Sequence, residues 1–427
     1  MADSAARRQP FICVCAAGAG RVHEPAPSGG RQLQHSCSHG PGLLLGTRAA
    51  ALVEAMYKSI RDAEVLVAGG GPAGLAAAIA ARQAGFAVTV VDGAHPPIDK
   101  ACGEGIMPDG LAALRQLGVR IGPEQGAPFR GIRFLNDDAQ VEADFPHGAG
   151  YGIRRTVLHQ LLVDRATEAG ISLHWGTRIT GLSAAGVVIG GQHVDYRWLI
   201  CADGHNSLLR RLAGLDVSRS ARRRFGFRRH YRVAPWSNFV EVHWSNCGQM
   251  YVTPVSDSEI CVALITRSRG LGWEEALPHF PALRSRLKDA EPGNRHLGAL
   301  SITRRLAAVQ LGNIALVGEA SGSVDAVTGE GLSMAFRQAI ALAAAMPAGH
   351  LQQYEMAHRR IARLPRMMST LMLAMDKHPG FRRRVFRALA SEPDYFRRLL
   401  ALHTGAIAPL NFGWRETVSL GWHLLAA

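Results

Sequence analysis

Long apolar runs and acidic residues are both scarce in this sequence. No stretch reaches the roughly 18 consecutive apolar residues that a membrane-spanning helix needs, so we expect a protein that is not integral to a membrane. Asp and Glu number 34 against 48 Lys and Arg, which gives a formal net charge of +14. Aromatic residues make up 7% of the chain and are not spaced along the basic stretches as base-stacking groups would be. We therefore expect no nucleic-acid partner.

Paired cysteines are absent as well. The seven cysteines are odd in number and include no C-x-x-C pair, which argues against a disulfide framework and against a zinc site. We predict no metal site, and the reducing cytoplasm is the compartment that fits best. The seven residues are Cys13, Cys15, Cys37, Cys102, Cys201, Cys247 and Cys261.

Residues 1–58 differ in composition from the rest of the chain. They are rich in Ala, Gly, Arg, Ser, Pro and His and show no sustained apolar periodicity, so we expect a disordered or dispensable extension. The whole chain of 427 residues is 47% hydrophobic. That content is enough for two or three folded domains after the extension.

The stretch VLVAGGGPAGLAAAIAARQAGFAVTVVD, from Val65 to Asp92, has the pattern of a nucleotide-binding βαβ unit. A short apolar run predicts a buried parallel strand. Gly69, Gly71 and Gly74 follow it with G-x-G-x-x-G spacing. The first glycine permits the tight turn, the second lets the backbone approach a pyrophosphate, and the third lets the new helix lie close to the strand.

The residues around these glycines complete the predicted nucleotide site. Pro72 and Ala73 begin the helix, whose N-terminal N–H groups and positive dipole end face the phosphates. Asp92 ends the second strand, where a carboxylate can accept hydrogen bonds from a ribose hydroxyl. This unit alone does not distinguish FAD from NAD.

Two later motifs indicate which nucleotide is bound. ADGHNSLLR, from Ala202 to Arg210, has the spacing D-G-x-x-S-x-x-R, and ALVGEASGSVDAVTGEG runs from Ala315 to Gly331. With the glycine unit, these motifs resemble the para-hydroxybenzoate-hydroxylase-like FAD superfamily, which includes class A flavin monooxygenases and geranylgeranyl reductases. The resemblance covers the chain from Val65 to about Met346.

The resemblance implies a resident FAD, with NAD(P)H as a transient reductant. Arg154 or Arg155 resembles the family's arginine near the flavin phosphates and ribose. Glu319 stands where the family usually has Asp, which keeps the charge but lengthens its reach. The cofactor-binding residues expected from the glycine unit and from the resemblance are Gly69, Gly71, Pro72, Ala73, Gly74, Asp92, Arg154, Asp203, Gly204, Gly318, Glu319, Thr328, Gly329 and Gly331.

The predicted fold is of α/β class. We expect a discontinuous, Rossmann-like FAD-binding domain over residues 59–228 and 301–348. A β-rich substrate domain is expected at residues 229–300 with parts of 125–152, because three short alternating apolar runs lie in that region. A helical C-terminal region is expected over residues 349–427.

The resemblance favours a monooxygenase that hydroxylates a hydrophobic aromatic or polyketide-like molecule. O₂ would react with the reduced flavin to give a flavin hydroperoxide, and the protein would supply orientation and a water-poor cavity. The alternative is a geranylgeranyl-reductase-like enzyme that reduces isoprenoid double bonds, which the segments CGEG and TGEG favour. A non-catalytic flavin-binding protein is a third, weaker reading.

Four residues are candidates for catalysis. Cys102 lies in KACGEGIMP, which resembles the Cys-Gly loop of the geranylgeranyl reductases and would sit near the flavin ring. His230, His243 and Tyr251 bring titratable or stacking groups to strands expected over the flavin. Each of the four is also readily explained as an ordinary buried or strand residue.

Arginine is concentrated in two places, Ser218 to Arg232 and the region after Glu355. The second includes FRRRVFRALA, Phe381 to Ala390, in which an apolar face lies opposite several arginines. Such a pattern suggests peripheral contact of a cytoplasmic protein with an anionic membrane surface or a lipid-like substrate.

Overall fold

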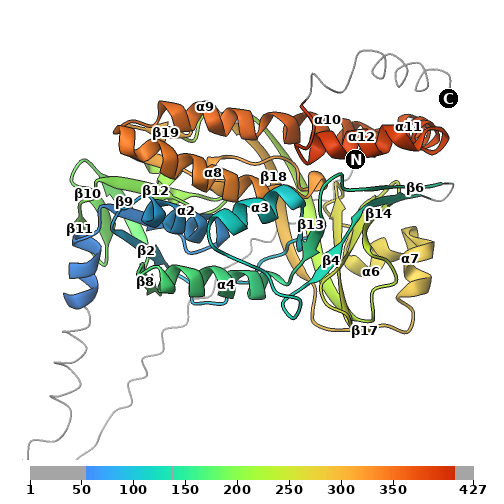
Figure 1. Ribbon diagram of the computed structural model, residues 1–427, viewed down its shortest axis with the longest axis horizontal. Helices are drawn as coiled ribbons and strands as arrows, with labels where there is room; N and C mark the ends of the chain where they lie inside the picture. Colours follow the sequence, from blue (N-terminus) through green and yellow to red (C-terminus); the bar gives the residue numbers. More distant parts are fainter. Residues whose placement is uncertain (1–53, 137–138, 409–427) are drawn as a thin grey trace, which may run out of the picture. The chain divides into compact units, whose positions relative to one another are not determined.

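The structure is a computed structural model that describes residues 54–136 and 139–408. Within these ranges a parallel sheet with its helices lies at one end and a larger, mostly antiparallel sheet at the other (Figure 1). Helices near the C-terminus run along one edge of both. In the part of the chain so described, no helix combines the length and the apolarity needed to span a membrane.

The folded part begins earlier than the expected boundary at residue 58. Residues 54–61 are helical, Tyr57 and Ile60 are buried, and the Tyr57 hydroxyl donates a 3.0 Å hydrogen bond to the Ile189 carbonyl. The rest of the extension predicted over residues 1–58 lies outside the described residues.

The first sheet has the order β19-β20-β12-β1-β2-β8. All pairs are parallel except β19 with β20. The central strands are fully buried, as expected for a parallel sheet covered on both faces. The strands are β1 (Val65–Ala68), β2 (Val88–Asp92), β8 (Ser172–Trp175), β12 (Trp198–Cys201), β19 (Gln310–Leu311) and β20 (Ile314–Leu316).

Helices cover this sheet because their small apolar residues form flat faces. In α2 (Pro72–Gln83) every residue from Gly74 to Ala81 is buried, which lets the helix lie close to the strands. It contacts α4 (Arg155–Glu168) and α8 (Gly331–Ala345). The other helical segments of this half are α3 (Pro108–Gln116), α5 (Leu208–Leu212), η2 (Gly318–Ser321), η3 (Ala326–Thr328) and η4 (Met346–Ala348).

The second sheet has eight strands, in the order β17-β13-β16-β15-β14-β5-β6, with β18 paired to β13. The expected domain boundaries at 228/229 and 300/301 fall inside β13 and β18, so the same long strands belong to both predicted domains. The strands are β5 (Gly131–Leu135), β6 (Gln140–Asp144), β13 (Ser218–Arg232), β14 (Phe239–Trp244), β15 (Gly248–Pro254), β16 (Glu259–Thr266), β17 (Glu291–Pro292) and β18 (Leu297–Leu306).

Two further sheets are short. One has the order β11-β10-β9 and the other β3-β7-β4. The second brings the loop after β2 against the larger sheet. Their strands are β3 (Gly105–Ile106), β4 (Ala127–Phe129), β7 (Gly150–Gly152), β9 (Ile179–Ser183), β10 (Gly186–Ile189) and β11 (Gln192–Val194).

The larger sheet is covered on its two faces by different helices. One face forms an apolar core with α6 (Trp273–Ala276), η1 (Leu277–His279) and α7 (Pro281–Arg286). The other face packs against the C-terminal helices. These are α10 (Arg363–Lys377), α11 (Pro379–Ser391) and α12 (Pro393–His403), whereas α9 (Gln352–Ile361) packs against α8.

Candidate functional site

A cavity of about 830 Å³ extends from the ends of β1, β2 and β12 to the space between the larger sheet and the C-terminal helices. Its first part, the nucleotide cradle, is formed by the glycine turn after β1, by Asp92 and by the loops after β12 and β20. Its second part, the apolar chamber, is formed by side chains of β5, β14, β15 and α10 to α12. The two parts are continuous.

The glycines of the first motif have the roles that their spacing predicts. Gly69 has φ 111°, and a Cβ there would lie 2.5 Å from the Ala202 carbonyl oxygen. A Cβ on Gly74 would lie 1.8 Å from the Gly69 carbonyl oxygen, so only glycine permits this close approach. Gly71 instead faces open space. Gly71 lines the cavity beside Pro72 and Ala73 at the N-terminus of α2, whose unpaired N–H groups could bind a pyrophosphate.

Asp92 lies at the cavity with part of its carboxylate already engaged. Its Oδ2 accepts a 2.6 Å hydrogen bond from the Gly70 N–H, and its Oδ1 accepts a 2.7 Å bond from the Ala94 N–H. These bonds fix the side chain at the end of β2. Each oxygen can accept a further bond, so Asp92 is positioned to bind a ribose hydroxyl.

The second motif is hydrogen-bonded within itself and to the third motif. Asp203 and Gly204 line the cavity. The Ser207 hydroxyl donates a 2.5 Å bond to Asp203 Oδ1 and accepts one from the Arg210 N–H. The buried Arg210 guanidinium donates to the Ala320 carbonyl at 3.1 Å, which links this motif to the third. Arg210 is therefore a structural residue of the cradle.

The third motif places an ionised carboxylate at the cradle. Glu319 lines the cavity, and its Oε2 lies 2.5 Å from Lys100 Nζ. Burial by itself would raise the pKa of Glu319, but Lys100 and His205 outweigh burial and lower it. Gly318 has φ 59°, and a Cβ there would lie 2.5 Å from the Ala73 Cβ. The third motif thus lies directly against the start of α2.

The segment between η3 and α8 also lines the cavity, through Thr328, Gly329 and Gly331. Gly329 has φ 70°, in the region that favours glycine. Asp325 is buried and accepts a 3.1 Å bond from Arg224. Its carboxylate also accepts from the Val327 N–H, so it holds this loop in place.

Among the neighbouring arginines, Arg155 lines the cavity and Arg154 does not. Arg154 lies 3.3 Å from Glu259 and 3.4 Å from His230 Nδ1, away from the cradle. The prediction that Arg154 binds the cofactor is therefore not supported by its position. Arg155, the open alternative, is the better candidate for a cofactor contact.

Two of the four catalytic candidates line the cavity. Tyr251 donates a 2.8 Å hydrogen bond to the Val327 carbonyl, and burial raises the pKa of its hydroxyl. Cys102 lines the cavity in the loop after β2, and burial raises the pKa of its thiol. At neutral pH this residue is a thiol and not a thiolate nucleophile.

The other two candidates do not reach the cavity. His230 is fully buried behind Glu104, with its Nε2 2.6 Å from Glu104 Oε2. His243 lies on the opposite face of β14 from Val240 and Val242, which line the chamber. It is 3.1 Å from Glu241 instead. Alternate residues of a strand face opposite sides, and this alternation turns His243 away.

Three site residues were missed by the sequence analysis, namely Glu104, Glu330 and His403. Glu104 lines the cavity with φ 59° and pairs with Arg228 at 2.7 Å. Glu330 is buried, and His403 lines the chamber. The two glutamates stand inside the glycine segments CGEG and TGEG, so their position was a usable signal. No comparable signal marked His403.

Comparisons with known proteins agree with this geometry. A family model described as FAD binding domain matches residues 62–272. The menaquinone reductase of Mycolicibacterium smegmatis is 36% identical over 163 residues, which are 36% of this chain and 40% of that protein. The menaquinone reductase of Mycobacterium tuberculosis strain H37Rv is 29% identical over 301 residues, covering 64% of this chain and 73% of the relative.

Two further similarities broaden the group. A digeranylgeranylglycerophospholipid reductase of Methanosphaera stadtmanae is 25% identical over 310 residues, covering 65% of this chain and 76% of that protein. The flavin-dependent brominase Bmp2 has the same fold, with a TM-score of 0.71 at 16% identity, covering 85% of this chain and 98% of the brominase. The chain therefore belongs to the FAD-dependent oxidoreductases that share this FAD binding domain.

Proposed function

We propose that this protein is a reductase that saturates a carbon–carbon double bond in a lipid with an isoprenoid chain. The observation that carries the proposal is the apolar chamber, which continues directly from the nucleotide cradle. Its walls contain almost only aliphatic, aromatic and thioether groups. They include Phe129, Ile132, Phe134, Val240, Val242, Met368, Leu371, Met372, Met375, Val385, Leu389, Phe396, Leu399 and Leu400.

The chamber favours a flexible apolar chain over a polar substrate. Burying a chain there gains about 25 cal/mol for each Å² removed from water. Methionine side chains adapt their shape, which suits a long and flexible ligand. The relatives named for menaquinone and for digeranylgeranylglycerophospholipid act on hydrophobic molecules of this class, which supports the proposal.

Residues of the cradle would hold the cofactor beside this chamber. Gly71, Asp92 and Glu319 lie where the pyrophosphate and ribose regions of FAD are expected, and Thr328 and Gly329 lie where the loop meets the chamber. Reduced FAD supplies hydride chemistry when it is bound. NAD(P)H is the proposed source of those electrons. The protein orients the chain and excludes water.

Monooxygenation, which the sequence favoured first, stays a prediction. A water-poor chamber would serve that reaction too. The two functions differ in whether flavin oxidation and product formation require O₂. We would load the protein with FAD, reduce it anaerobically, and mix it in a stopped-flow instrument with an isoprenoid quinone or a geranylgeranyl lipid.

Anaerobic oxidation of the flavin, with a product that has gained two hydrogens at a carbon–carbon double bond of its isoprenoid chain, is the expected result. A product that gains oxygen only when O₂ is present would establish the monooxygenase instead. Flavin that NAD(P)H cannot reduce, with every candidate substrate present, would support a non-catalytic role.

A lipid substrate also requires access to a membrane, and we propose that α9 and α10 provide it. Met356, Arg360, Arg363 and Met367 are exposed and recur at helical spacing along these helices, with Met356 64% and Met367 50% exposed. Exposed methionines between arginines suit a surface of anionic lipid headgroups.

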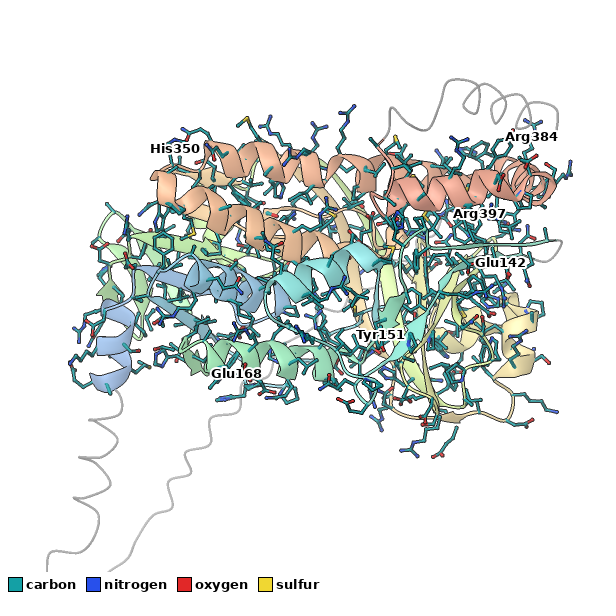
Figure 2. All side chains as sticks on the ribbon, in the orientation of Figure 1. Glu142, Tyr151, Glu168, His350, Arg384 and Arg397 are labelled. Atoms are coloured by element: carbon teal, nitrogen blue, oxygen red, sulfur yellow. The ribbon has the colours of Figure 1, made fainter. Side chains whose placement is uncertain are left out.

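The apolar face of α11, which the sequence suggested for membrane contact, is buried inside the protein. Val385 and Leu389 of α11 are buried and line the chamber, and Phe381 packs against the same core. Arg384 and Arg397 are exposed on the outer side of α11 and α12 (Figure 2), whereas Arg382 is buried and donates a 3.2 Å hydrogen bond to the Ser245 carbonyl. The amphipathic pattern of α11 therefore reflects the core of this protein.

A further inference from the structure

Glu330 and His403 form an isolated polar pair at the wall of the chamber. Glu330 lies between Gly329 and Gly331 at the start of α8 and is 2% exposed. His403 ends α12 and lines the chamber. Its Nδ1 lies 3.6 Å from Glu330 Oε2, and its Nε2 lies 3.3 Å from the Thr328 carbonyl oxygen.

The facing atoms of the pair lack hydrogen-bond partners. Among the described residues, Glu330 Oε2 and His403 Nδ1 are both buried side-chain atoms without one, and so is Asp109 Oδ1 of α3. A buried polar atom without a partner is costly and is retained mainly where it has a function. Glu330 and His403 lie beside Thr328 and Gly329, so these unpaired atoms are at the end of the chamber that adjoins the cradle.

Hydrogen-bond chemistry assigns the protons. A carbonyl oxygen only accepts, so the Nε2 of His403 carries the hydrogen that faces the Thr328 carbonyl. The Nδ1 of His403 is then a lone pair that points toward Glu330. A protonated Glu330 can donate to it, whereas an ionised Glu330 cannot. The geometry therefore fits a neutral carboxylic acid beside a neutral imidazole.

The surrounding charges give the same assignment. Burial and the nearby Asp109 raise the pKa of Glu330 well above its ordinary value, while Arg337 opposes that shift. Arg337 forms an ion pair with Asp109, at 3.4 Å from its Oδ2, and makes no such pair with Glu330 among the described residues. Burial lowers the pKa of His403 to about 4, opposed by its contact with the Thr328 carbonyl. At neutral pH the pair holds one transferable proton.

We propose that Glu330 and His403 are a proton-donating pair that serves the reaction in the chamber. The proposal rests on the proposed double-bond reduction. Bound, reduced FAD would supply the hydride for one carbon of the double bond, and the pair would give a proton to the other carbon. The Glu330 proton would pass to His403 Nδ1 while the Nε2 proton, released from the Thr328 carbonyl that borders the chamber, would pass to the substrate carbon. A saturated bond, oxidised flavin and a Glu330 carboxylate result, and solvent returns the proton to Glu330.

The test uses FAD-loaded full-length protein and two substitutions. Glu330→Gln keeps the shape of the side chain but removes its acidic proton, and His403→Asn removes the acceptor. Glu392→Gln and His350→Asn are matched controls, because both residues are exposed and lie outside the cavity. Infrared difference spectra between the oxidised and dithionite-reduced protein report protonated carboxyl groups without any substrate.

We expect a protonated-carboxyl band in the wild type that is lost in Glu330→Gln, shifted in His403→Asn and unchanged in both controls. The oxidation of reduced flavin by an isoprenoid lipid should slow about 100-fold in both variants, within the usual contribution of a general acid. Reduction by dithionite should keep its wild-type rate, because that step does not use the pair.

Separate outcomes overturn the two proposals. A wild-type spectrum without a Glu330-dependent band would overturn the proton-donating pair, whatever the substrate. Wild-type rates in both variants would overturn it as well. If Glu330→Gln fails to bind FAD, the His403→Asn variant tests the pair by itself. An unshifted carboxyl band and a wild-type rate of flavin oxidation in that variant would then overturn the proposal. If the Glu330-dependent band is present but no isoprenoid lipid oxidises the reduced flavin of the wild-type protein, only the proposed function is overturned.

Discussion

The nucleotide cradle and the apolar chamber share one cavity but are built in different ways. The cradle is made mainly from backbone: glycines that allow close approach, the N-terminus of α2 and carboxylates at strand ends. The chamber is made from side chains of β5, β14, β15 and three C-terminal helices. Substitutions in the cradle should therefore affect the cofactor, and substitutions in the chamber should affect the substrate.

Changing a glycine of the cradle is expected to have the largest effect. A Cβ on Gly74 would lie 1.8 Å from the Gly69 carbonyl oxygen, whereas a Cβ on Gly71 meets open space. We expect Gly74→Ala to destabilise the protein by about 3 kcal/mol, as overpacking does, and to lose FAD. Gly71→Ala should keep the apo stability but weaken FAD binding. Chemical denaturation and flavin titration measure both, and equal behaviour of the two variants would contradict the assigned roles.

Filling the chamber should separate substrate binding from cofactor binding. Met372 lines the chamber on α10, and Met367 of the same helix is 50% exposed. We expect Met372→Trp to bind FAD normally but to raise the KM for an isoprenoid lipid at least 100-fold. Met367→Trp is the matched control and should leave the KM unchanged. An unchanged KM in Met372→Trp would show that the lipid does not use the chamber.

The face of the larger sheet away from the chamber should affect stability but not the cofactor. Burial alone would raise the pKa of Glu241, but hydrogen bonds from His243 and Trp236 lower it to about 2. Because the folded pKa is depressed, this stabilisation is present above the unfolded pKa of about 4.5 and is lost as the pH falls toward 2.

We expect Glu241→Gln to lower the free energy of unfolding by about 3 kcal/mol at pH 7, since 2.5 pKa units correspond to roughly that amount. The difference from wild type should shrink between about pH 4.5 and pH 2. Unfolding curves across this range measure it, with exposed Glu275→Gln as the control. A difference that does not change with pH, or a loss of FAD, would contradict this account.

The smallest effect is expected at the outer surface of the chamber's helices. Each basic residue near an anionic membrane contributes about 1 kcal/mol. The double reversal Arg360→Glu and Arg363→Glu should therefore weaken binding to phosphatidylglycerol vesicles more than tenfold. Arg284→Glu with Arg295→Glu makes the same change of charge on exposed residues elsewhere. Flotation assays compare the two pairs, and equal losses would indicate a general charge effect without a docking face.

The sequence predicted the cradle better than the chamber. The three glycines and Asp92 occupy the expected places, because their roles depend on backbone conformation within one βαβ unit. His230 and His243 were chosen from strands expected over the flavin, and neither reaches the cavity. To choose them correctly, one must know which face of each strand borders the cavity. The alternation of side chains defines two faces, but only the assembled sheet shows which of them points inward.

The methionine stripe of α10 illustrates the same limit. The helical spacing of Met368, Met372 and Met375 is typical of a buried face, and all three are buried. The spacing could not show that this face would line a cavity. That property depends on β5 and β14, which are remote in the chain and leave a gap in front of the helix.

The amino-acid sequence by itself determined the α/β class and the nucleotide-binding unit, because these depend on short motifs with a defined backbone geometry, and its resemblance to a known family indicated FAD. Only the tertiary structure decided which arginine and which histidines meet the cavity. It also decided that the C-terminal helices enclose an apolar chamber and that Glu330 faces His403. The physical reason is that side chains far apart in sequence are brought together by packing, and no local pattern encodes that meeting.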